Sequence, residues 1–276
     1  MDAPPRATYI RLAVSARAII ESIGASVIRA VEDFGALVSL GVAALVGAFR
    51  PPLRLGLLFA QLDFIGVGSL FIVGLTGLFT GLVLALQAVY AFSIFNAESM
   101  VGATVELSLS REIAPVFTAL FVTARVGSAI ATELGTMRVT EQIDALETMA
   151  VNPVQYLITP RVVAGTLMAP VLTMFFNSLA LFGCWVVAVP FSHISSGTFW
   201  THLQRLVDAG DILQGLAKSV VFGFALTTIA CARGYRAEGG ARGVGIATTQ
   251  AVVLGSVSIL LIDVIITALQ VSGGHG

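Results

Sequence analysis

Long apolar runs without charged side chains dominate the pattern of this chain. Residues 64–97 contain no Asp, Glu, Lys or Arg, and neither do residues 162–204. A helix needs about 20 apolar residues to cross a hydrocarbon core of ~30 Å. By this measure the pattern predicts five membrane-spanning helices, near 66–93, 113–135, 162–190, 212–232 and 248–271.

Basic residues fall almost entirely on one side of these predicted spans. With the N-terminus in the cytoplasm, the cytoplasmic side receives Arg50, Arg54, Arg138, Arg161, Arg233, Arg236 and Arg242. The opposite side receives only Arg205 and, at the membrane edge, Arg111. Short cytoplasmic loops of membrane proteins are enriched in Lys and Arg. The distribution therefore predicts a cytoplasmic N-terminus and a C-terminus on the other side.

The first 60 residues follow a different pattern. On a helical wheel, one arc of about 160° collects the charged side chains, and the other face is apolar; the charged residues are Arg11, Arg17, Glu21, Arg29, Glu32 and Asp33. This pattern is typical of a helix that lies in the headgroup layer. Residues 34–49 are apolar but short, and Pro51 and Pro52 follow them. We interpret 1–62 as an interfacial or re-entrant helical region and 63–276 as a five-span domain; a sixth short span at 34–49 is the alternative.

Composition supports an all-α integral membrane protein. The chain is 57% hydrophobic and 11% charged, whereas a soluble domain is about 25% charged. Soluble enzymes and nucleic-acid binders are therefore excluded. The two cysteines, Cys184 and Cys231, lie in apolar runs, so neither a disulfide framework nor a metal site is expected. No Gly-Lys dipeptide occurs, which excludes a phosphate-binding loop. The chain needs no cofactor, and a partner would bind any ATP and Mg²⁺.

The segment between the second and third predicted spans is rich in acidic residues. Within 137–152, Glu141, Asp144 and Glu147 recur every three residues, and apolar residues occupy another face. The spacing predicts a short amphipathic helix whose start Thr140 can cap. A solvated loop helix is one interpretation. The other is a helix that docks into a groove of a cytoplasmic partner and transmits its motion.

Charged residues also occur within or beside the predicted spans, where they are costly and often functional. Arg111 and Glu112 lie at the outer mouth of the second span, and Lys218 lies in the fourth. Arg125 follows Arg111 on nearly the same helix face, about 21 Å deeper. These residues either pair between helices or surround a cavity for a polar headgroup. Apolar surface of such a cavity could come from Leu84, Gln87, Ala91, Phe92 and Phe95.

Several motifs resemble the MlaE/YrbE permease family. They are L-S-L-S-R-E-I-A-P (107–115), A-R-V-G-S-A-I-A-T-E-L-G-T-M-R-V-T-E-Q-I-D-A-L (124–146), M-A-V-N-P (149–153) and G-G-A-R-G-V-G-I-A-T-T (239–249). The resemblance covers roughly residues 50–270. It implies the membrane subunit of an ABC transporter that moves phospholipids between the inner and outer membranes, with an interfacial N-terminal helix and five spans.

The resemblance also implies partners and site residues. Two copies would form the translocation core in the bacterial inner membrane, with a cytoplasmic ATPase below and a periplasmic ring of MCE-domain proteins above; a STAS-domain accessory protein is a further candidate. The segment 138–150 resembles the family's coupling helix, with Arg138, Glu141, Gln142, Asp144, Leu146, Glu147 and Met149 as the residues that would contact the ATPase. Arg111, Glu112 and Lys218 resemble polar positions near the family's lipid pocket.

Two other functions remain open from the residues alone. A secondary transporter could use Glu112, Lys218 and Asp263 for proton coupling, although such proteins usually carry paired repeats. A membrane scaffold for a periplasmic assembly would transport nothing. In each case the chain itself is expected to catalyse no covalent chemistry.

Overall fold

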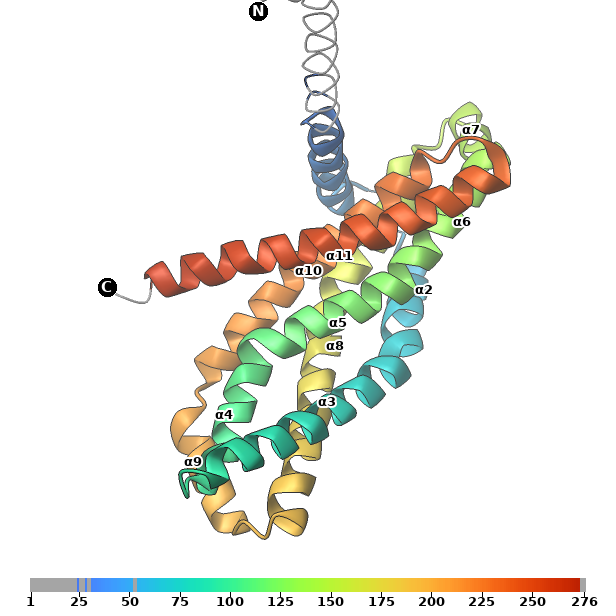
Figure 1. Cartoon of the computed structure of the whole chain (residues 1–276). Helices are drawn as coiled ribbons and strands as arrows, with labels where there is room; N and C mark the ends of the chain where they lie inside the picture. The colour runs from blue at the N-terminus through green and yellow to red at the C-terminus, as the bar shows by residue number, and fades with distance from the viewer. Residues whose placement is uncertain (1–23, 25–27, 29–30, 52–53, 274–276) are drawn as a thin grey trace, which may run out of the picture.

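Helices make up almost all of the chain in the computed structural model, which describes residues 24, 28, 31–51 and 54–273. Within those residues there are no strands. The first span is a continuous helical run, Leu55–Ser93, composed of α2 (Leu55–Leu62), a π turn (Asp63–Val67) and α3 (Gly68–Ser93). The other long helices are α8 (Thr159–Val186), α10 (Ala209–Tyr235) and α11 (Gly240–Gly273). Figure 1 shows how they pack around a central helical run.

That central run, Glu98–Val139, forms the second span. After a short 3-10 turn it contains α4 (Val101–Ser108), α5 (Ala114–Val122) and α6 (Ser128–Val139). Two π turns separate these helices, Leu109–Ile113 and Thr123–Gly127. A π turn inserts a residue into the helix and changes which residues share a face, and such turns are frequent at functional sites. Here they contain the three charged residues Arg111, Glu112 and Arg125.

The helices extend beyond the spans that the sequence predicts. The second span begins at Glu98 rather than near residue 113, so Arg111 and Glu112 lie within a continuous helical run and not at its mouth. The third span begins at Val154 and the fifth at Gly240. In the second and third spans the difference arises because Arg111, Glu112 and Arg161 pair with other helical segments, whereas the hydropathy pattern reads such charged residues as the end of a span.

Glycines allow α3 and α8 to pack with their backbones in contact. A side chain at Gly81 would overlap the carbonyl group of Ala180, and one at Gly77 would lie 2.7 Å from the carbonyl oxygen of Phe176. The Gly77-x-x-x-Gly81 spacing thus serves helix packing within the chain. Small residues at such positions are a general means of bringing membrane helices together.

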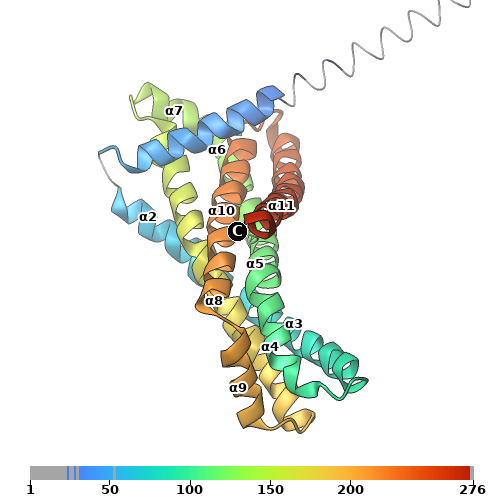
Figure 2. The same cartoon turned by 90° about the vertical axis from the view of Figure 1, so that its left-hand side faces the viewer.

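The helix Val31–Ala48 is one of six among the described residues that are long and apolar enough to cross a membrane. It lies across one end of the bundle, oblique to α8 and α10, at the end where α7 (Gln142–Thr148) also lies (Figure 2). The interfacial or re-entrant assignment of 1–62 and the alternative of a sixth span both stay predictions. Of its predicted charged face, Glu32 and Asp33 are described, whereas Arg11, Arg17, Glu21 and Arg29 lie outside the described residues.

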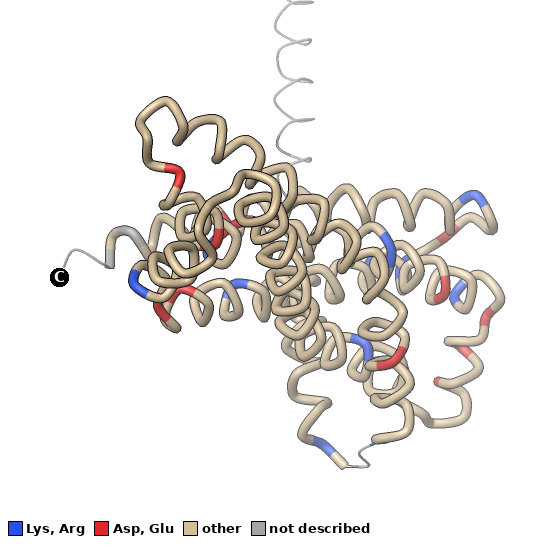
Figure 3. Tube along the Cα trace, turned by 90° about the horizontal axis from the view of Figure 1, so that it is seen from below, with Lys and Arg blue, Asp and Glu red and all other residues tan. Residues whose placement is uncertain are grey.

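The residues predicted to face the cytoplasm gather at this same end. Arg233 and Arg236 contact Asp33 at 3.3 and 3.4 Å. The Gln155 side chain donates a hydrogen bond to the carbonyl of Arg50, and Arg54 stacks on the ring of Tyr156. Figure 3 shows the charged positions as short blue and red segments in a trace that is mostly uncharged. The charge asymmetry read from the sequence is therefore a property of one face of the folded bundle.

Candidate lipid site and coupling segment

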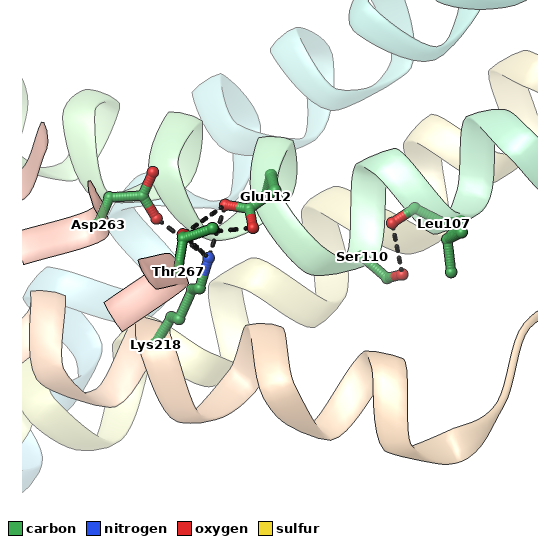
Figure 4. A network of polar contacts seen from close by, with 6 residues as sticks. All are labelled: Leu107, Ser110, Glu112, Lys218, Asp263 and Thr267. Carbon is green, nitrogen blue, oxygen red and sulfur yellow. Dashed lines mark hydrogen bonds and ion pairs between the residues drawn. The ribbon is translucent and has the colours of Figure 1, made fainter. Parts of the chain in front are cut away.

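Lys218 lies at the centre of a polar cluster between three helical segments. Its side chain is completely buried. The ammonium group contacts Glu112 Oε2 at 2.6 Å and Asp263 Oδ1 at 3.2 Å, and it donates a hydrogen bond to Thr267 Oγ1 at 2.8 Å. Glu112 comes from the π turn after α4, Lys218 from α10, and Asp263 and Thr267 from α11 (Figure 4). We call these four residues the Lys218 cluster.

The cluster gives the buried ammonium two carboxylate partners. A buried charge is tolerated only when it is paired and hydrogen-bonded. The carboxylates are less enclosed, because the side chains of Glu112 and Asp263 keep 41% and 19% of their exposure. Lys218 is thus closed off on one side, while its acidic partners remain partly open. With one cation and two carboxylates, the cluster can accept a further cation or proton at its open side.

Arg111 has a separate partner. Its guanidinium binds Asp211 Oδ1 through Nε at 2.8 Å and through Nη2 at 2.5 Å. Asp211 is buried in the first turn of α10, where its other oxygen accepts a hydrogen bond from the backbone N–H of Asp208. Arg111 itself remains about half exposed. Neighbours in sequence, Arg111 and Glu112 therefore bind different turns of α10.

Arg125 does not join either group. It donates hydrogen bonds to the carbonyl of Phe64 and to Ser69 Oγ, at 3.2 and 2.9 Å. Arg125 and Arg111, predicted to lie on nearly the same helix face, thus contact different segments, and two π turns interrupt the regular periodicity on which that prediction rests. Arg125 instead ties the second span to the beginning of the first.

The predicted apolar lining comes from the end of α3 and the turn after it. Leu84 and Phe92 are half-buried and pack against the core, whereas Gln87, Ala91 and Phe95 are exposed. The contacts that define the Lys218 cluster come from the π turn after α4, from α10 and from α11, so none of these five residues takes part in them. A cavity shared by both groups stays a prediction.

The predicted coupling segment folds as a short helix with a tight turn at each end. Helix α6 ends at Val139, and Glu141 adopts a left-handed conformation (φ 60°) before α7 begins at Gln142. Arg138 therefore belongs to α6, from which it pairs with Asp144 Oδ1 at 2.5 Å. Thr140 does not cap α7, because the chain turns at the next residue; its hydroxyl donates to the Thr136 carbonyl of α6.

One face of α7 holds the segment against the bundle. Ile143 is buried and Leu146 is half-buried against the core. Glu147 accepts a hydrogen bond from the hydroxyl of Tyr235 at 3.4 Å. The remaining predicted residues of the segment, Glu141, Gln142, Asp144 and Met149, are exposed. The segment thus offers an acidic outer surface while its inner face is fixed to α10 and the core.

Two residues of these sites, Asp211 and Thr267, are not identified from the sequence. Asp211 stands three positions after Asp208 at the start of a helix, and reciprocal capping of this kind is a recognisable signal. Thr267 stands four positions after Asp263, so the two share a helix face in an otherwise apolar span. Residues that could hold a metal do not gather anywhere in the described part of the chain.

Together, the long apolar helices and the charges paired between them define a multi-pass integral membrane protein. A family model described as "Permease MlaE" matches residues 58–269. The chain therefore belongs to the MlaE permease family. Its relatives include proteins named as ABC transporter permeases.

Three relatives illustrate the range of the family. A "Probable ABC transporter permease protein" of Rickettsia bellii is 42% identical, over 91% of this chain and 97% of the relative. The "Intermembrane phospholipid transport system permease protein MlaE" of Haemophilus influenzae is 40% identical, over 92% and 98%. "Protein TRIGALACTOSYLDIACYLGLYCEROL 1, chloroplastic" of Arabidopsis thaliana is 36% identical, over 77% and 61%.

Proposed function

We propose that this chain is the permease of an ABC transporter that moves phospholipids between the inner and outer membranes of a bacterium and maintains the lipid asymmetry of the outer membrane. The name of the Haemophilus influenzae relative, an intermembrane phospholipid transport permease, supports this substrate. The structural observation that carries the proposal is the Lys218 cluster. Its partly open carboxylates, which the buried ammonium holds together, would provide polar contacts for a headgroup inside an otherwise apolar bundle.

The proposed assembly contains two copies of the chain in the inner membrane. Within a single copy of the chain, only 11% of the residues in the apolar stretch of α11 are buried. A second copy that packs beside α11 would enclose the open side of the Lys218 cluster. The proposal adds a cytoplasmic ATPase that binds ATP and Mg²⁺, a periplasmic ring of MCE-domain proteins, and a STAS-domain accessory protein as a further candidate.

In this proposal α7 couples ATP hydrolysis to movement of the permease. Its exposed acidic face, which includes Glu141 and Asp144, would dock into a groove of the ATPase. Its inner face is fixed to the core through Ile143 and to α10 through Glu147. Displacement of α7 by the ATPase would therefore be passed to α10, which also carries Lys218. That route connects the nucleotide cycle to the proposed lipid site.

The experiment is purification of the chain with its companions in nanodiscs, followed by lipid transfer measured with and without ATP. We expect an ATPase to co-purify with the chain and bound phospholipid to be detected by mass spectrometry. Transfer of labelled phospholipid should require ATP and should stop when the ATPase is inactivated. A complex that transfers lipid at the same rate without ATP would contradict the proposal.

Ion-coupled transport is a second candidate, because the residues that it requires are in direct contact. Glu112, Lys218 and Asp263 form one network, and a proton could move within such a network. This candidate requires lipid transport by the chain alone in liposomes, driven by an ion gradient. A non-transporting scaffold would instead leave lipid transfer unchanged when the Lys218 cluster is altered.

A further inference from the structure

A second polar site lies on the other side of the central helical run. A cavity of about 160 Å³, open at one side, is lined by the Glu98–Val139 run, α8 and α10. Five of its lining residues are polar: Glu106, Ser110, Thr173, Asn177 and, at the exposed edge, Ser178. Its apolar rim includes Met174 of α8 and Ile212 of α10, both exposed at the side of the bundle. Helices α8 and α10 lie side by side there (Figure 2).

Glu106 and Asn177 leave two acceptor atoms without partners in this cavity wall. The Asn177 amide donates a hydrogen bond of 2.6 Å to Glu106 Oε1. Glu106 is only 3% exposed, and its other oxygen, Oε2, is buried without a hydrogen-bond partner, as is Asn177 Oδ1. Among the described residues no cation pairs with Glu106. Buried polar atoms are nearly always satisfied, so each such exception requires an explanation.

The other polar groups of the cavity also present acceptors. The hydroxyls of Ser110 and Thr173 donate to the backbone carbonyls of Glu106 and Ala169, at 2.8 and 2.9 Å. Each hydroxyl has one hydrogen, so its oxygen can face the cavity only as an acceptor. The Ser178 hydroxyl at the edge likewise donates to the Met174 carbonyl. A carboxylate, a carboxamide oxygen and three hydroxyl oxygens therefore line the cavity, and acceptors outnumber donors there. Such a set favours a ligand that carries positive charge and several N–H or O–H groups.

The position of the cavity indicates what carries that charge. Its rim, which includes Met174, Ile212 and Leu216, is apolar and belongs to membrane-spanning helices. A ligand that enters from this side needs an apolar body with a cationic end. The volume suits an aminoethyl group rather than a whole lipid. We propose that this cavity binds the primary ammonium group of an amino-phospholipid headgroup, with Glu106 as its counter-charge and Asn177 as a further acceptor.

This site is separate from the Lys218 cluster. Gly215 of α10 packs directly on the carbonyl group of Ser110, where any side chain would overlap it. No hydrogen bond or ion pair among the described residues joins Glu106 or Asn177 to the Lys218 cluster. In Figure 4 the side chain of Ser110 lies apart from the cluster. The two sites also differ in chemistry, because the carboxylates of the Lys218 cluster are already paired with an ammonium group, whereas Glu106 has no cationic partner among the described residues.

The test is photolabelling of the full-length chain in nanodiscs with two phospholipids that carry the same photoreactive acyl chain. One is a phosphatidylethanolamine, which has three N–H donors, and the other is a phosphatidylcholine, which has none. We expect labelling of residues 174–181 and 212–216 to be about tenfold stronger with phosphatidylethanolamine, since a charge-assisted hydrogen bond discriminates by about that factor. Mass spectrometry of the labelled peptides measures the difference.

Substitutions of Glu106 and Asn177 test whether these two acceptors cause the preference for phosphatidylethanolamine. Glu106→Gln removes the charge, and Asn177→Leu removes the second acceptor; each should reduce the preference to less than about threefold. Glu238→Gln, which alters an exposed carboxylate at the cytoplasmic end, is the matched control and should leave the preference unchanged. Size-exclusion profiles and thermal unfolding would identify a variant that does not fold. The comparison of the two lipids on the unaltered chain requires no variant.

Equal labelling by both lipids on the unaltered chain would overturn the proposal. So would labelling that is independent of lipid and is suppressed by Na⁺ or K⁺, because the cavity would then hold an inorganic cation. The inference goes beyond the proposed transport function, since binding is measured without ATP or companions. A permease that transfers lipid but shows no headgroup preference here would refute only the inference.

Discussion

The ammonium group of Lys218 lies 2.6 Å from the carboxylate of Glu112, although 106 positions separate them in the chain. Through this contact the central helical run is bound to α10, and through Asp263 the same ammonium reaches α11. One cation therefore holds three membrane-spanning segments. The two carboxylates around it would repel each other in its absence, which makes the cluster sensitive to the loss of Lys218 alone.

Lys218→Met should destabilise the protein strongly, because it leaves two carboxylates near each other without a cation. Removal of one partner from a buried ion pair costs about 3–5 kcal/mol. Combination with Glu112→Gln and Asp263→Asn should recover part of that loss, since no unpaired charge remains. Thermal unfolding in nanodiscs measures both variants. A triple variant no more stable than Lys218→Met would show that packing, not charge, dominates at this position.

Arg111→Glu should reduce the amount of phospholipid that remains bound to the purified protein. The substitution places a carboxylate opposite Asp211 and removes a half-exposed cation from the predicted lipid site. Native mass spectrometry would measure occupancy. Arg205→Glu, an exposed substitution in α9 (Ser196–Leu206), is the control. Equal lipid occupancy in Arg111→Glu and the unaltered protein would remove Arg111 from the site.

Glu141→Lys should uncouple ATP hydrolysis from lipid transfer in the assembled transporter. Glu141 is exposed at the beginning of α7, and reversed charge at an interface costs several kcal/mol. We expect about tenfold less lipid transferred per ATP hydrolysed, with the chain still folded. Glu238→Lys reverses another exposed charge at the same end, outside α7. The same loss in both variants would indicate a general charge effect rather than docking of α7.

Gly81→Ala should destabilise the α3–α8 packing by about 1–3 kcal/mol, because the added methyl group has no space beside the backbone of Ala180. Gly56→Ala is the matched control, since nothing lies within 4 Å of a side chain at that position of α2. It should be neutral or slightly stabilising. Thermal unfolding of the two variants under identical conditions provides the comparison, and equal midpoints would show that α3 can shift away from α8.

The coupling segment illustrates how far local sequence patterns reach. The alternation of acidic and apolar residues correctly predicts a helix with Ile143 and Leu146 on its inner face. The pattern does not locate the turn, because a left-handed residue at Glu141 leaves no signal that distinguishes it from a helical one. As a result Thr140 ends one helix instead of beginning the next.

The multi-pass membrane character of the chain can be deduced from the sequence alone, because a hydrocarbon core about 30 Å thick imposes length and composition on every helix that crosses it. The orientation of the helices in the membrane stays a prediction. The partners of the charged residues depend on the tertiary structure. Arg111, Glu112 and Arg125 lie in π turns, which rotate the following residues onto new faces. Contacts such as Lys218 with Glu112, or Glu106 with Asn177, depend on how helices distant in sequence are rotated relative to each other. Only tertiary packing sets that rotation, so the periodicity of a single helix cannot predict it.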